Sequence, residues 1–507
     1  MHLLTSMRLA SIVAAAAVAL TCARPPVPEP APPSLPGPVP ASATACELLS
    51  QPREDPGEIT VALLDEVDVG HAPWPQNDGE RLLFRHLYET LLRVDCQDSV
   101  HPGLAESWSS AGDGRLWRFT LREGASFWDG VPVTADHVVA SWAGGAAEEL
   151  ASAAGIDSLK VESARRLAVY LDRARPEVPR LFADPEFAVA RRVEPWYWPY
   201  GSAPGHVEMG EVGGEDRVDH REVRLHPPDA EGPVVRFLQF PGVDPRDVLR
   251  GGYDVLVTGD QSVIEYAAPQ PTHSSVPLPW DRSYVLLSTT RVRELRMGGE
   301  PGGLSNDLLD ALARDAVRSD ARGHRPPSWW EDTATCGELS PASSGLPRIA
   351  PGAYRTSGPR RIVYPLGDHV ARGLSQRIVG LAAERARRSE EAGALAAAVP
   401  GLVGEDGTLL AAGLAGDELD ASLRYGDEFA YVVPLPRIVV DPCFAARKLA
   451  SRVEWLAPQE LDLASTLVPL VDTRRHVVAA SGRVGLYVDW DGTVLISAAP
   501  AGGGSRQ

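Results

Sequence analysis

Hydrophobic and polar positions follow two different periods between residues 77 and 142, and the rest of the chain is organised around this stretch. Leucines recur every four residues from Leu83, which is the spacing of one face of an α-helix. Asn77 stands before this run as an N-cap, and Glu80 occupies the position from which a capping box reaches back. The pattern predicts an amphipathic helix that begins after Asn77.

A two-residue period follows the helix. Apolar and polar residues alternate from Trp117 to Leu121, which predicts a half-buried strand. Asp113-Gly114 just before it favours a tight turn. Residues 104–122 are therefore expected to form a hairpin, and Thr134 is expected to cap a second helix.

Strands and helices alternate again further along the chain. Residues 234–240 and 253–257 predict two strands around a short helix that begins after Asp244. Residues 361–364 and 369–388 predict another strand followed by a helix. This alternation is typical of α/β folds with mixed or parallel sheets.

The first strand is expected at residues 58–64, and the loop 65–76 follows it. In an open α/β sheet, ligands tend to bind at the carboxyl ends of strands. His71 and Trp74 in this loop are the first ligand candidates. His71 is equally readable as a solvated loop histidine, whereas Trp74, between two prolines, offers a rigid contact surface.

Composition restricts the class of protein. The chain has 507 residues, 44% hydrophobic and 23% charged, which fits a soluble protein with more than one core. Its net charge of −19 argues against a nucleic-acid partner, which would require a basic face. Serine-hydrolase elbows, phosphate loops and zinc-binding spacings are absent from the sequence, so we expect no catalytic residue, metal or cofactor.

The amino-terminal residues indicate export. Arg8 precedes an apolar run at residues 9–20, which is short for a membrane span and typical of a secretory signal. Residues 1–22 are interpreted as a signal peptide of the lipoprotein type, with Cys22 as the lipidation site. Thr21 departs from the usual lipoprotein pattern, and ordinary cleavage further on is the alternative. Residues 23–56 are rich in proline and are expected to form a tether.

A resemblance to a known family emerges at residues 101–142, HPGLAESWSSAGDGRLWRFTLREGASFWDGVPVTADHVVASW. This run resembles the signature of the extracellular solute-binding proteins of ABC transporters, family 5, which bind oligopeptides, dipeptides or nickel chelates. Residues 234–257 are similar to a second family segment. The resemblance implies a two-lobed α/β fold, periplasmic-binding-protein type II-like, with mixed sheets and an inter-lobe cleft. It also implies a binding protein rather than an enzyme, acting as a monomer.

The same resemblance divides the chain. Lobe I is expected to comprise residues 57–285 plus 476–497, and lobe II residues 286–475, with a flexible tail at 498–507. The segment 280–289 resembles the one that crosses between the lobes. A Gly- and Pro-rich tract at 298–359 departs from the family pattern and leaves the ligand class open.

Four cysteines remain after Cys22, an even number in an exported chain, so two disulfides are expected. Three pairings are possible. Pairing Cys46 with Cys96 and Cys336 with Cys443 would place each disulfide within one lobe. A metal site is the weaker alternative.

Further ligand candidates rest on the resemblance alone. Tyr431, Arg437 and Asp441 occupy places comparable to the family's ligand-facing aromatics and its Asp-Pro pair. Each of them is also readable as a structural residue.

The expected function is the substrate-binding component of an ABC importer. It would capture a peptide-like or other small solute between its lobes and deliver it to a membrane permease, while a lipid anchor holds it at the periplasmic or cell-surface side of the membrane. One alternative is a surface lipoprotein that keeps the scaffold in a sensor or structural role without transport.

A remote alternative is an enzyme. Residues 486–496, LYVDWDGTVLI, resemble the nucleophile loop of haloacid-dehalogenase-type phosphatases, with Asp489 as nucleophile and Asp491 as acid/base. Only 14 residues follow Thr493, too few for the rest of that machinery. The alternating pattern on both sides of Asp491-Gly492 favours a hairpin instead.

Overall fold

The structure is a computed structural model of the chain. It describes residues 46–49, 57–111, 113–175, 178–192, 198–203, 205–214, 217–227, 232–288, 322–323, 360–391, 409–426, 428–437, 445, 449, 453 and 467–496. The chain forms two compact units, Met1–Ala43 and Thr44–Gln507, and all described residues lie in the second. Several predicted features lie outside the described residues, namely Cys22, Cys336, Asp441, Cys443 and the tail 498–507.

The largest sheet has 11 strands, in the order β16-β15-β17-β13-β18-β12-β2-β11-β10-β9, with β14 paired to β18. Strand β2 runs parallel to β11 and β12, and β15 runs parallel to β16 and β17, whereas the other pairs are antiparallel. The strands are β2 Glu58–Leu63, β9 His206–Gly214, β10 Arg217–His226, β11 Val234–Gln239, β12 Val255–Thr258, β13 His273–Ser288, β14 Arg322–Gly323, β15 Arg360–Pro365, β16 Leu409–Leu414, β17 Ala430–Pro436 and β18 Leu467–Ala480.

Helices cover both faces of the first half of this sheet, which contains β2, β11 and β12. Because side chains alternate along a strand, Ile59, Val61 and Leu63 of β2 pack with the leucines of α1 (Asp78–Leu87) on one face. Ala62 packs on the other face with α5 (Pro245–Arg250) and α6 (Gln261–Ala267). The predicted strands and helices of this region are confirmed.

The second half of the sheet, which contains β15, β16 and β17, is built in the same way. Ala430 and Val432 of β17 pack with α9 (His369–Glu391). The residues between and after them, Tyr431 and Val433, pack on the opposite face with α10 (Gly416–Tyr425). Each half of the sheet is thus a three-layer α/β/α arrangement.

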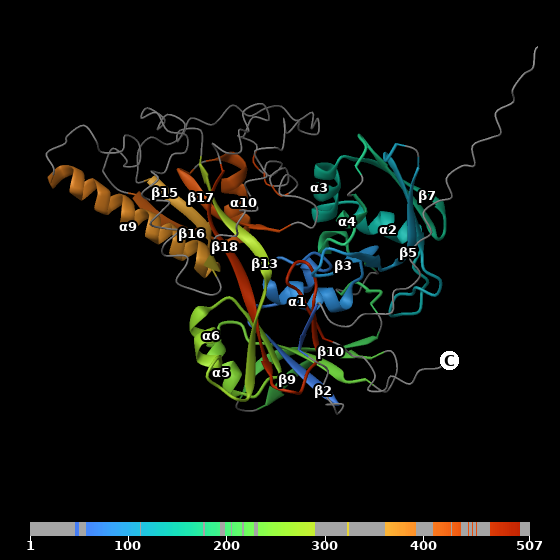
Figure 1. The fold of residues 1–507 in the computed structure, drawn as a ribbon, viewed down its shortest axis with the longest axis horizontal. Helices are drawn as coiled ribbons and strands as arrows, with labels where there is room; N and C mark the ends of the chain where they lie inside the picture. Colours follow the sequence, from blue (N-terminus) through green and yellow to red (C-terminus); the bar gives the residue numbers. More distant parts are fainter. Residues whose placement is uncertain are drawn as a thin grey trace, which may run out of the picture. The chain divides into compact units, whose positions relative to one another are not determined.

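Two long strands belong to both halves, and Figure 1 shows them running side by side. Strand β18 pairs with β12 through its last residues, and β13 pairs with β17 through its last residues. Between these regions, the register of β13 against β18 shifts from Pro277 to Arg282. The chain therefore crosses between the two halves by β13 and returns by β18, and we call this pair the crossing strands.

A separate antiparallel sheet has the order β5-β6-β8-β7. Its β5 (Ala105–Ala111) and β6 (Leu116–Leu121) form the predicted hairpin. Its core contains a group of aromatic residues among aliphatic ones, and Trp142 stacks on Phe182 with ring centroids 5.1 Å apart. The other elements of this region are α2 Ala135–Trp142, α3 Gly145–Ala154, β7 Ile156–Ser163, β8 Arg166–Leu171, α4 Val178–Leu181 and η2 Pro185–Phe187.

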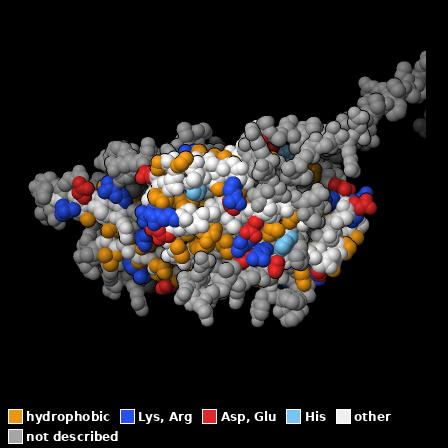
Figure 2. Space-filling view, turned by 90° about the horizontal axis from the view of Figure 1, so that it is seen from below, with side chains coloured by type: hydrophobic (Ala, Val, Ile, Leu, Met, Phe, Trp, Pro, Cys, Tyr) orange, Lys and Arg blue, Asp and Glu red, His pale blue; other side chains and the backbone are white. Residues whose placement is uncertain are grey.

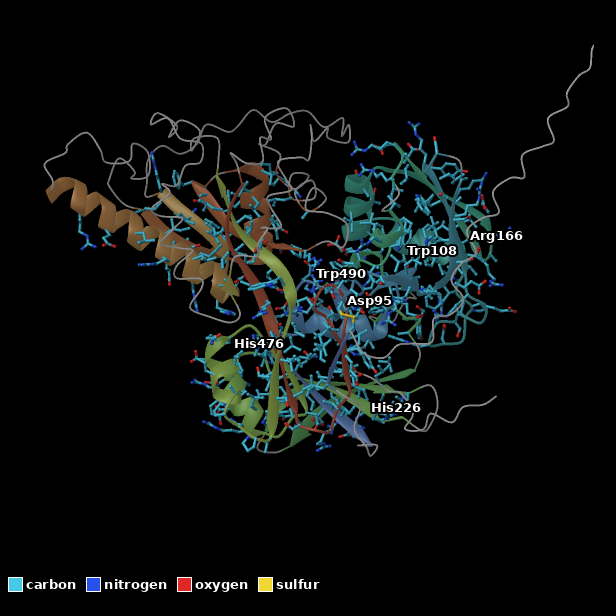
Figure 3. All side chains as sticks on the ribbon, in the orientation of Figure 1. Asp95, Trp108, Arg166, His226, His476 and Trp490 are labelled. Carbon is cyan, nitrogen blue, oxygen red and sulfur yellow. A yellow bond between two sulfur atoms is a disulfide. The ribbon has the colours of Figure 1, made fainter. Side chains whose placement is uncertain are left out.

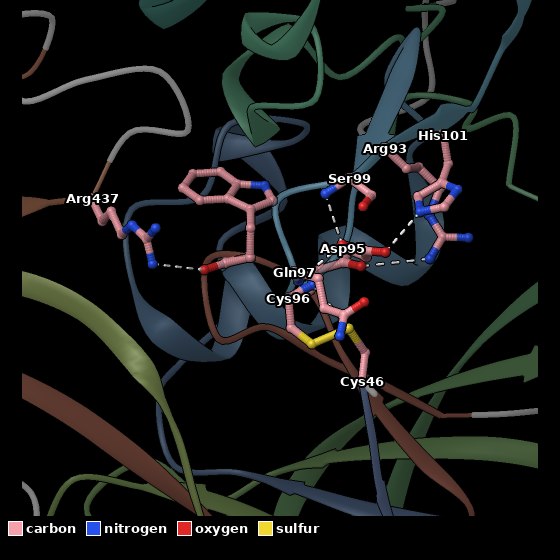
Figure 4. Close-up of a disulfide and its surroundings, with 10 residues drawn as sticks. Cys46, Arg93, Asp95, Cys96, Gln97, Ser99, His101 and Arg437 are labelled. Atoms are coloured by element: carbon pink, nitrogen blue, oxygen red, sulfur yellow. Dashed lines mark hydrogen bonds and ion pairs between the residues drawn. A yellow bond between two sulfur atoms is a disulfide. The ribbon is translucent and has the colours of Figure 1, made fainter. Parts of the chain in front are cut away.

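A small sheet, β1-β19-β20, joins the two ends of the described chain. Its strands are β1 (Glu47–Leu49), β19 (Leu486–Val488) and β20 (Val494–Ile496), and β19 and β20 form the predicted terminal hairpin. Cys46, just before β1, forms a disulfide with Cys96, the pair that we expected (Figure 4). Residues 46–49 are thus part of the folded body, although we had placed them in the tether 23–56. A further hairpin pairs β3 (Leu92–Val94) with β4 (Val100–Pro102).

Charged side chains of both signs are interspersed on the face shown in Figure 2. In the part of the chain that the structure describes, no helix combines the length and apolar character needed to cross a bilayer.

Candidate functional site

The loop that follows β2 is held by a buried carboxylate. Glu80, with no exposed surface, accepts hydrogen bonds through Oε1 from the backbone N–H of Asp68 (2.9 Å) and through Oε2 from that of Gln76 (2.7 Å). Its Oε1 also lies 2.8 Å from Nδ1 of His71. Because three donors converge on it, Glu80 fixes the loop to helix α1 at both ends.

The start of α1 was predicted well, with one correction. Asn77 caps the helix, and its Oδ1 accepts a hydrogen bond from the N–H of Glu80 at 2.8 Å. Glu80 reaches back as a capping box would, but its partner is the N–H of Gln76, one residue before the N-cap. The reason is that the same carboxylate must also reach Asp68 and His71.

His71 lies at the carboxyl end of the first strand, as expected, on the short 3-10 helix η1 (Val69–His71). Its imidazole is 40% exposed, bonded to Glu80 on one side and 3.8 Å from Oδ2 of Asp68 on the other. The exposed edge is compatible with ligand contact, and that role stays a prediction.

Trp74 uses part of its surface to attach the loop to the neighbouring helical region. Its Nε1 donates a hydrogen bond to the carbonyl oxygen of Glu186 at 3.1 Å, and its ring packs against the core of the β5-β6-β8-β7 sheet. The ring lies so close to Gly145 that a Cβ there would come within 2.6 Å of it. Trp74 is therefore a structural contact first, and its contact with a ligand also stays a prediction.

An ion-pair network joins helix α1 to the crossing strands. Oδ1 of Asp78, the first residue of α1, lies 2.5 Å from Nη2 of Arg282 on β13 and 3.5 Å from Nη1 of Arg475 on β18. Asp281 completes the network, since its Oδ2 lies 3.0 Å from Nη2 of Arg282 and 3.0 Å from Nε of Arg475. We call these four residues the strand clasp.

Charge and burial act in opposite directions at this position. Burial alone would raise the pKa of Asp78, but the guanidinium groups of Arg282 and Arg475 hold that pKa well below its ordinary value. Asp65, whose Oδ2 accepts a hydrogen bond from the N–H of Gly79 at 2.9 Å, behaves differently. Burial and the neighbouring Asp78 carboxylate raise the pKa of Asp65. The anionic form of Asp78 is therefore favoured, whereas the anionic form of the neighbouring Asp65 is disfavoured.

Tyr431 is a correction, because the structure gives it a core position. Its side chain is fully buried, and its hydroxyl donates a hydrogen bond to the carbonyl oxygen of Ser422 (2.7 Å) and accepts one from the N–H of Glu428 (3.2 Å). A ring enclosed in this way packs β17 against α10 and is not available to a ligand.

Arg437, which directly follows β17, reaches residues far away in the chain. Its N–H donates to the carbonyl oxygen of Asp281 at 2.7 Å, and its Nη1 donates to the carbonyl oxygen of Trp490 at 3.4 Å (Figure 4). Its Nη2 lies 3.8 Å from Oδ1 of Asp98. Arg437 therefore links the second half of the sheet to the terminal hairpin, and its role in solute binding stays a prediction.

The phosphatase alternative fails on burial and charge. Asp489 is 3% exposed, and its Oδ2 accepts hydrogen bonds from Nη2 (2.7 Å) and Nε (3.0 Å) of Arg85. Asp491 accepts from the N–H and hydroxyl of Thr493 (both 2.9 Å) within the hairpin turn. Trp490, which lies between the two aspartates, is 2% exposed, and Figure 3 shows it near Asp95. Neither carboxylate is available to attack a substrate, and within the described ranges no three His, Cys, Asp or Glu side chains are grouped to hold a metal.

The strand clasp was missed in the sequence, although a signal for it exists. Asp281-Arg282 and Arg474-Arg475 are charged pairs inside otherwise apolar strands, where charges are rarely placed without partners. Nothing local identifies Asp78 as their common partner, because it lies 204 residues from Arg282.

The sequence comparisons agree with the predicted resemblance. The model of the bacterial extracellular solute-binding proteins, family 5 Middle, matches residues 99–206. A putative binding protein of Haemophilus influenzae is 32% identical over 137 residues, covering 23% of this chain and 26% of that protein. The periplasmic oligopeptide-binding protein OppA of Escherichia coli is 36% identical over 104 residues, covering 20% and 18%. The matched segments thus span about a quarter or less of these curated relatives.

The fold comparisons extend over most of the chain. The murein tripeptide binding protein MppA of Escherichia coli has a TM-score of 0.54 at 15% identity, covering 84% of this chain and 94% of that one. The periplasmic binding protein DppA of Helicobacter pylori, solved with a peptide, has a TM-score of 0.55 at 13% identity, covering 87% and 98%.

These likenesses identify the class of protein. The predicted two-lobed α/β fold of the periplasmic binding proteins is confirmed, and so is the resemblance to family 5 over residues 99–206. The curated relatives that match are named as binding proteins, as the resemblance led us to expect.

Proposed function

We propose that this chain is the substrate-binding component of an ABC importer. It captures a peptide-like or other small solute in a cleft between its two lobes and delivers that solute to a membrane permease. The observation that carries the proposal is the pair of crossing strands, which connect two α/β/α halves of one sheet. Domain closure around a ligand needs such a connection, where a few residues absorb the bending.

The change of register between Pro277 and Arg282 supports a bend at that position. A solute favours the closed form only if it touches both lobes, because only differential contact shifts an equilibrium between two states. The loop at the end of β2 supplies groups on one side, with His71 exposed there. On the other side, Arg437 and Asp441 are the corresponding candidates.

The names of the relatives support the proposed solute class. Their printed names describe binding of oligopeptides, of murein peptide and of nickel. A peptide main chain suits a cleft beside a sheet, since N–H and C=O groups are matched regardless of side chain. We favour a peptide-like solute for this reason.

Export and membrane attachment complete the proposal. Residues 1–22 direct export, Cys22 carries the lipid, and residues 23–45, which precede the folded body that begins at Cys46, act as a tether. The protein works as a monomer at the periplasmic or cell-surface side of the membrane. A scaffold that has lost transport is the competing function, but its support is the tract 298–359, of which the structure describes only 322–323.

The test is native mass spectrometry of protein purified without refolding. We expect a second species whose extra mass corresponds to one small molecule, released when the protein is denatured. If protein from several growth media, including peptide-rich broth, always has the mass of the bare chain and takes up no peptide from a tryptic digest, the proposed function is wrong.

A further inference from the structure

The first three residues of α1, Asp78, Gly79 and Glu80, each contact a different part of the molecule. Asp78 belongs to the strand clasp, with Arg282 and Arg475 as partners. The N–H of Gly79 donates to Asp65 at the end of β2. The carboxylate of Glu80 holds the N–H groups of Asp68 and Gln76. One helical turn therefore contacts both crossing strands and both ends of the loop 64–76.

The contacts of this turn are well suited to transmit a displacement. Glu80 has no exposed surface, and the side chains of Asp281 and Arg475 are 6% and 7% exposed. Breaking the buried Asp281–Arg475 pair would leave a buried charge without compensation, so these two residues are constrained to move together. Asp78 and Arg282 are 37% and 21% exposed, and their ion pairs join α1 to this buried pair. Gly79 also packs closely against the loop, since a Cβ added there would lie 3.2 Å from Cβ of Asp65.

The clasp also contains unmet hydrogen-bonding capacity. In the described structure, Nη2 of Arg475 and Oδ1 of Asp281 are buried without a hydrogen-bond partner. Buried polar atoms are usually hydrogen-bonded, so these two atoms leave the clasp able to form further hydrogen bonds if the strands shift.

We propose that the first turn of α1 couples the loop 64–76, which we call the solute loop, to the crossing strands. Asp78 and Glu80 act as positioning residues. When β13 and β18 bend, Arg282 and Arg475 displace Asp78, and Glu80 carries the displacement to the loop that bears His71 and Trp74. Closure and the geometry of the solute loop then change together. The link to solute rests on the proposed function, whereas the coupling itself does not.

Hydrogen exchange measured by mass spectrometry on the solute-free protein tests the coupling. Arg475→Gln removes one cation of the clasp. Arg475 forms ion pairs with Asp78 and Asp281, and its only interaction with the described loop is electrostatic, with Asp65. We expect peptides covering residues 64–80 to exchange about threefold to tenfold faster in this variant, because their amides are held through Asp78 and Glu80. Arg475→Lys, which keeps the charge, is expected to restore most of the protection.

Arg483→Gln is the matched control. Arg483 lies just after β18, is 55% exposed and pairs with Asp254 (3.2 Å) rather than with the clasp. We expect it to leave exchange in residues 64–80 unchanged. Unchanged exchange there in Arg475→Gln overturns the coupling, and so does an equal increase in all peptides of the protein. The exchange experiment uses solute-free protein, so its result does not depend on solute binding. A wild-type protein that binds no solute would contradict the proposed function but not the coupling.

Discussion

Arg85 of helix α1 and Asp489 of the terminal hairpin form a buried ion pair, with Nη2 and Oδ2 2.7 Å apart across 404 residues of sequence. Burial would lower the pKa of Arg85, but Asp489 and Asp491 raise it above its ordinary value. Arg93 lies 3.5 Å from the other oxygen of Asp489 and is half exposed. The pair therefore fixes the end of the described chain to α1.

Removing Arg85 should be strongly destabilising. Arg85→Leu leaves the buried carboxylate of Asp489 with the half-exposed Arg93 as its remaining cation in the described structure, and we expect a loss of about 3 to 5 kcal/mol in the free energy of unfolding. Urea unfolding followed by tryptophan fluorescence measures it. Arg118→Leu, which breaks the exposed pair with Glu162 (2.8 Å), is the control and should cost far less. Equal losses of unfolding free energy in the two variants would show that the buried Arg85 pair stabilises the protein no more than an exposed pair does.

The disulfide should make a large contribution because it closes a loop of 50 residues between Cys46 and Cys96. The chain-entropy relation gives about 4 kcal/mol for a loop of this length. We expect the double variant Cys46→Ser, Cys96→Ser to lose roughly that amount in urea unfolding. A double variant as stable as the wild-type protein would mean that strand β1 is held by its pairing with β19 alone.

His86 should make the protein sensitive to mild acid. Burial lowers the pKa of His86 from 6.5 to about 4, and the neutral ring donates through Nδ1 to the carbonyl oxygen of Leu82 (2.8 Å) and accepts from the N–H of Ile496 (3.2 Å). The unfolded chain binds this proton near pH 6.5, whereas the folded protein binds it only near pH 4. Stability should therefore fall as pH drops through this window, by about 1 to 3 kcal/mol.

The measurement is the unfolding free energy at a series of pH values. In His86→Phe the ring contact with Phe237 can be kept but the titrating group is gone. We expect this variant to be less stable at pH 7, because two hydrogen bonds are lost, and to show a flatter dependence between pH 6.5 and 4. An unchanged slope would assign the acid sensitivity to other groups.

Gly145 should not tolerate a side chain. Its φ is +60°, and a Cβ would come within 2.6 Å of the Trp74 ring. We expect Gly145→Ala to cost about 1 to 3 kcal/mol and to lower the melting temperature. Gly373→Ala, in the middle of α9 with open space around it, should be neutral or raise the melting temperature. A neutral Gly145→Ala would show that the loop around Trp74 adapts without cost.

The sequence predicted the elements whose signal is local. The four-residue period from Leu83, the cap at Asn77 and the alternation around Trp117 all correspond to elements of the structure. It did not predict strand β1, because three residues form a strand only when β19, more than 400 positions later, supplies the partner. A pairing between segments so far apart produces no pattern in the sequence of either segment alone.

The candidate site was predicted less completely than the fold. The loop at the end of β2 follows from a general rule about strand ends, and His71 is indeed exposed there. Tyr431 was misplaced because β17 is covered on both faces, by α9 and by α10, so an aromatic residue on either face lies in the core. The clasp of Asp78, Asp281, Arg282 and Arg475 depends on three segments brought together only by the crossing strands.

The most direct test of solute binding is isothermal titration calorimetry on protein that has been unfolded, freed of small molecules by dialysis and refolded. Tripeptides to pentapeptides from a tryptic digest, and separately nickel with histidine, are the titrants. The account predicts saturable binding of one solute per chain to at least one of these, with peptides preferred. Refolded protein with native circular dichroism that gives no binding heat and no rise in melting temperature with either titrant would contradict it.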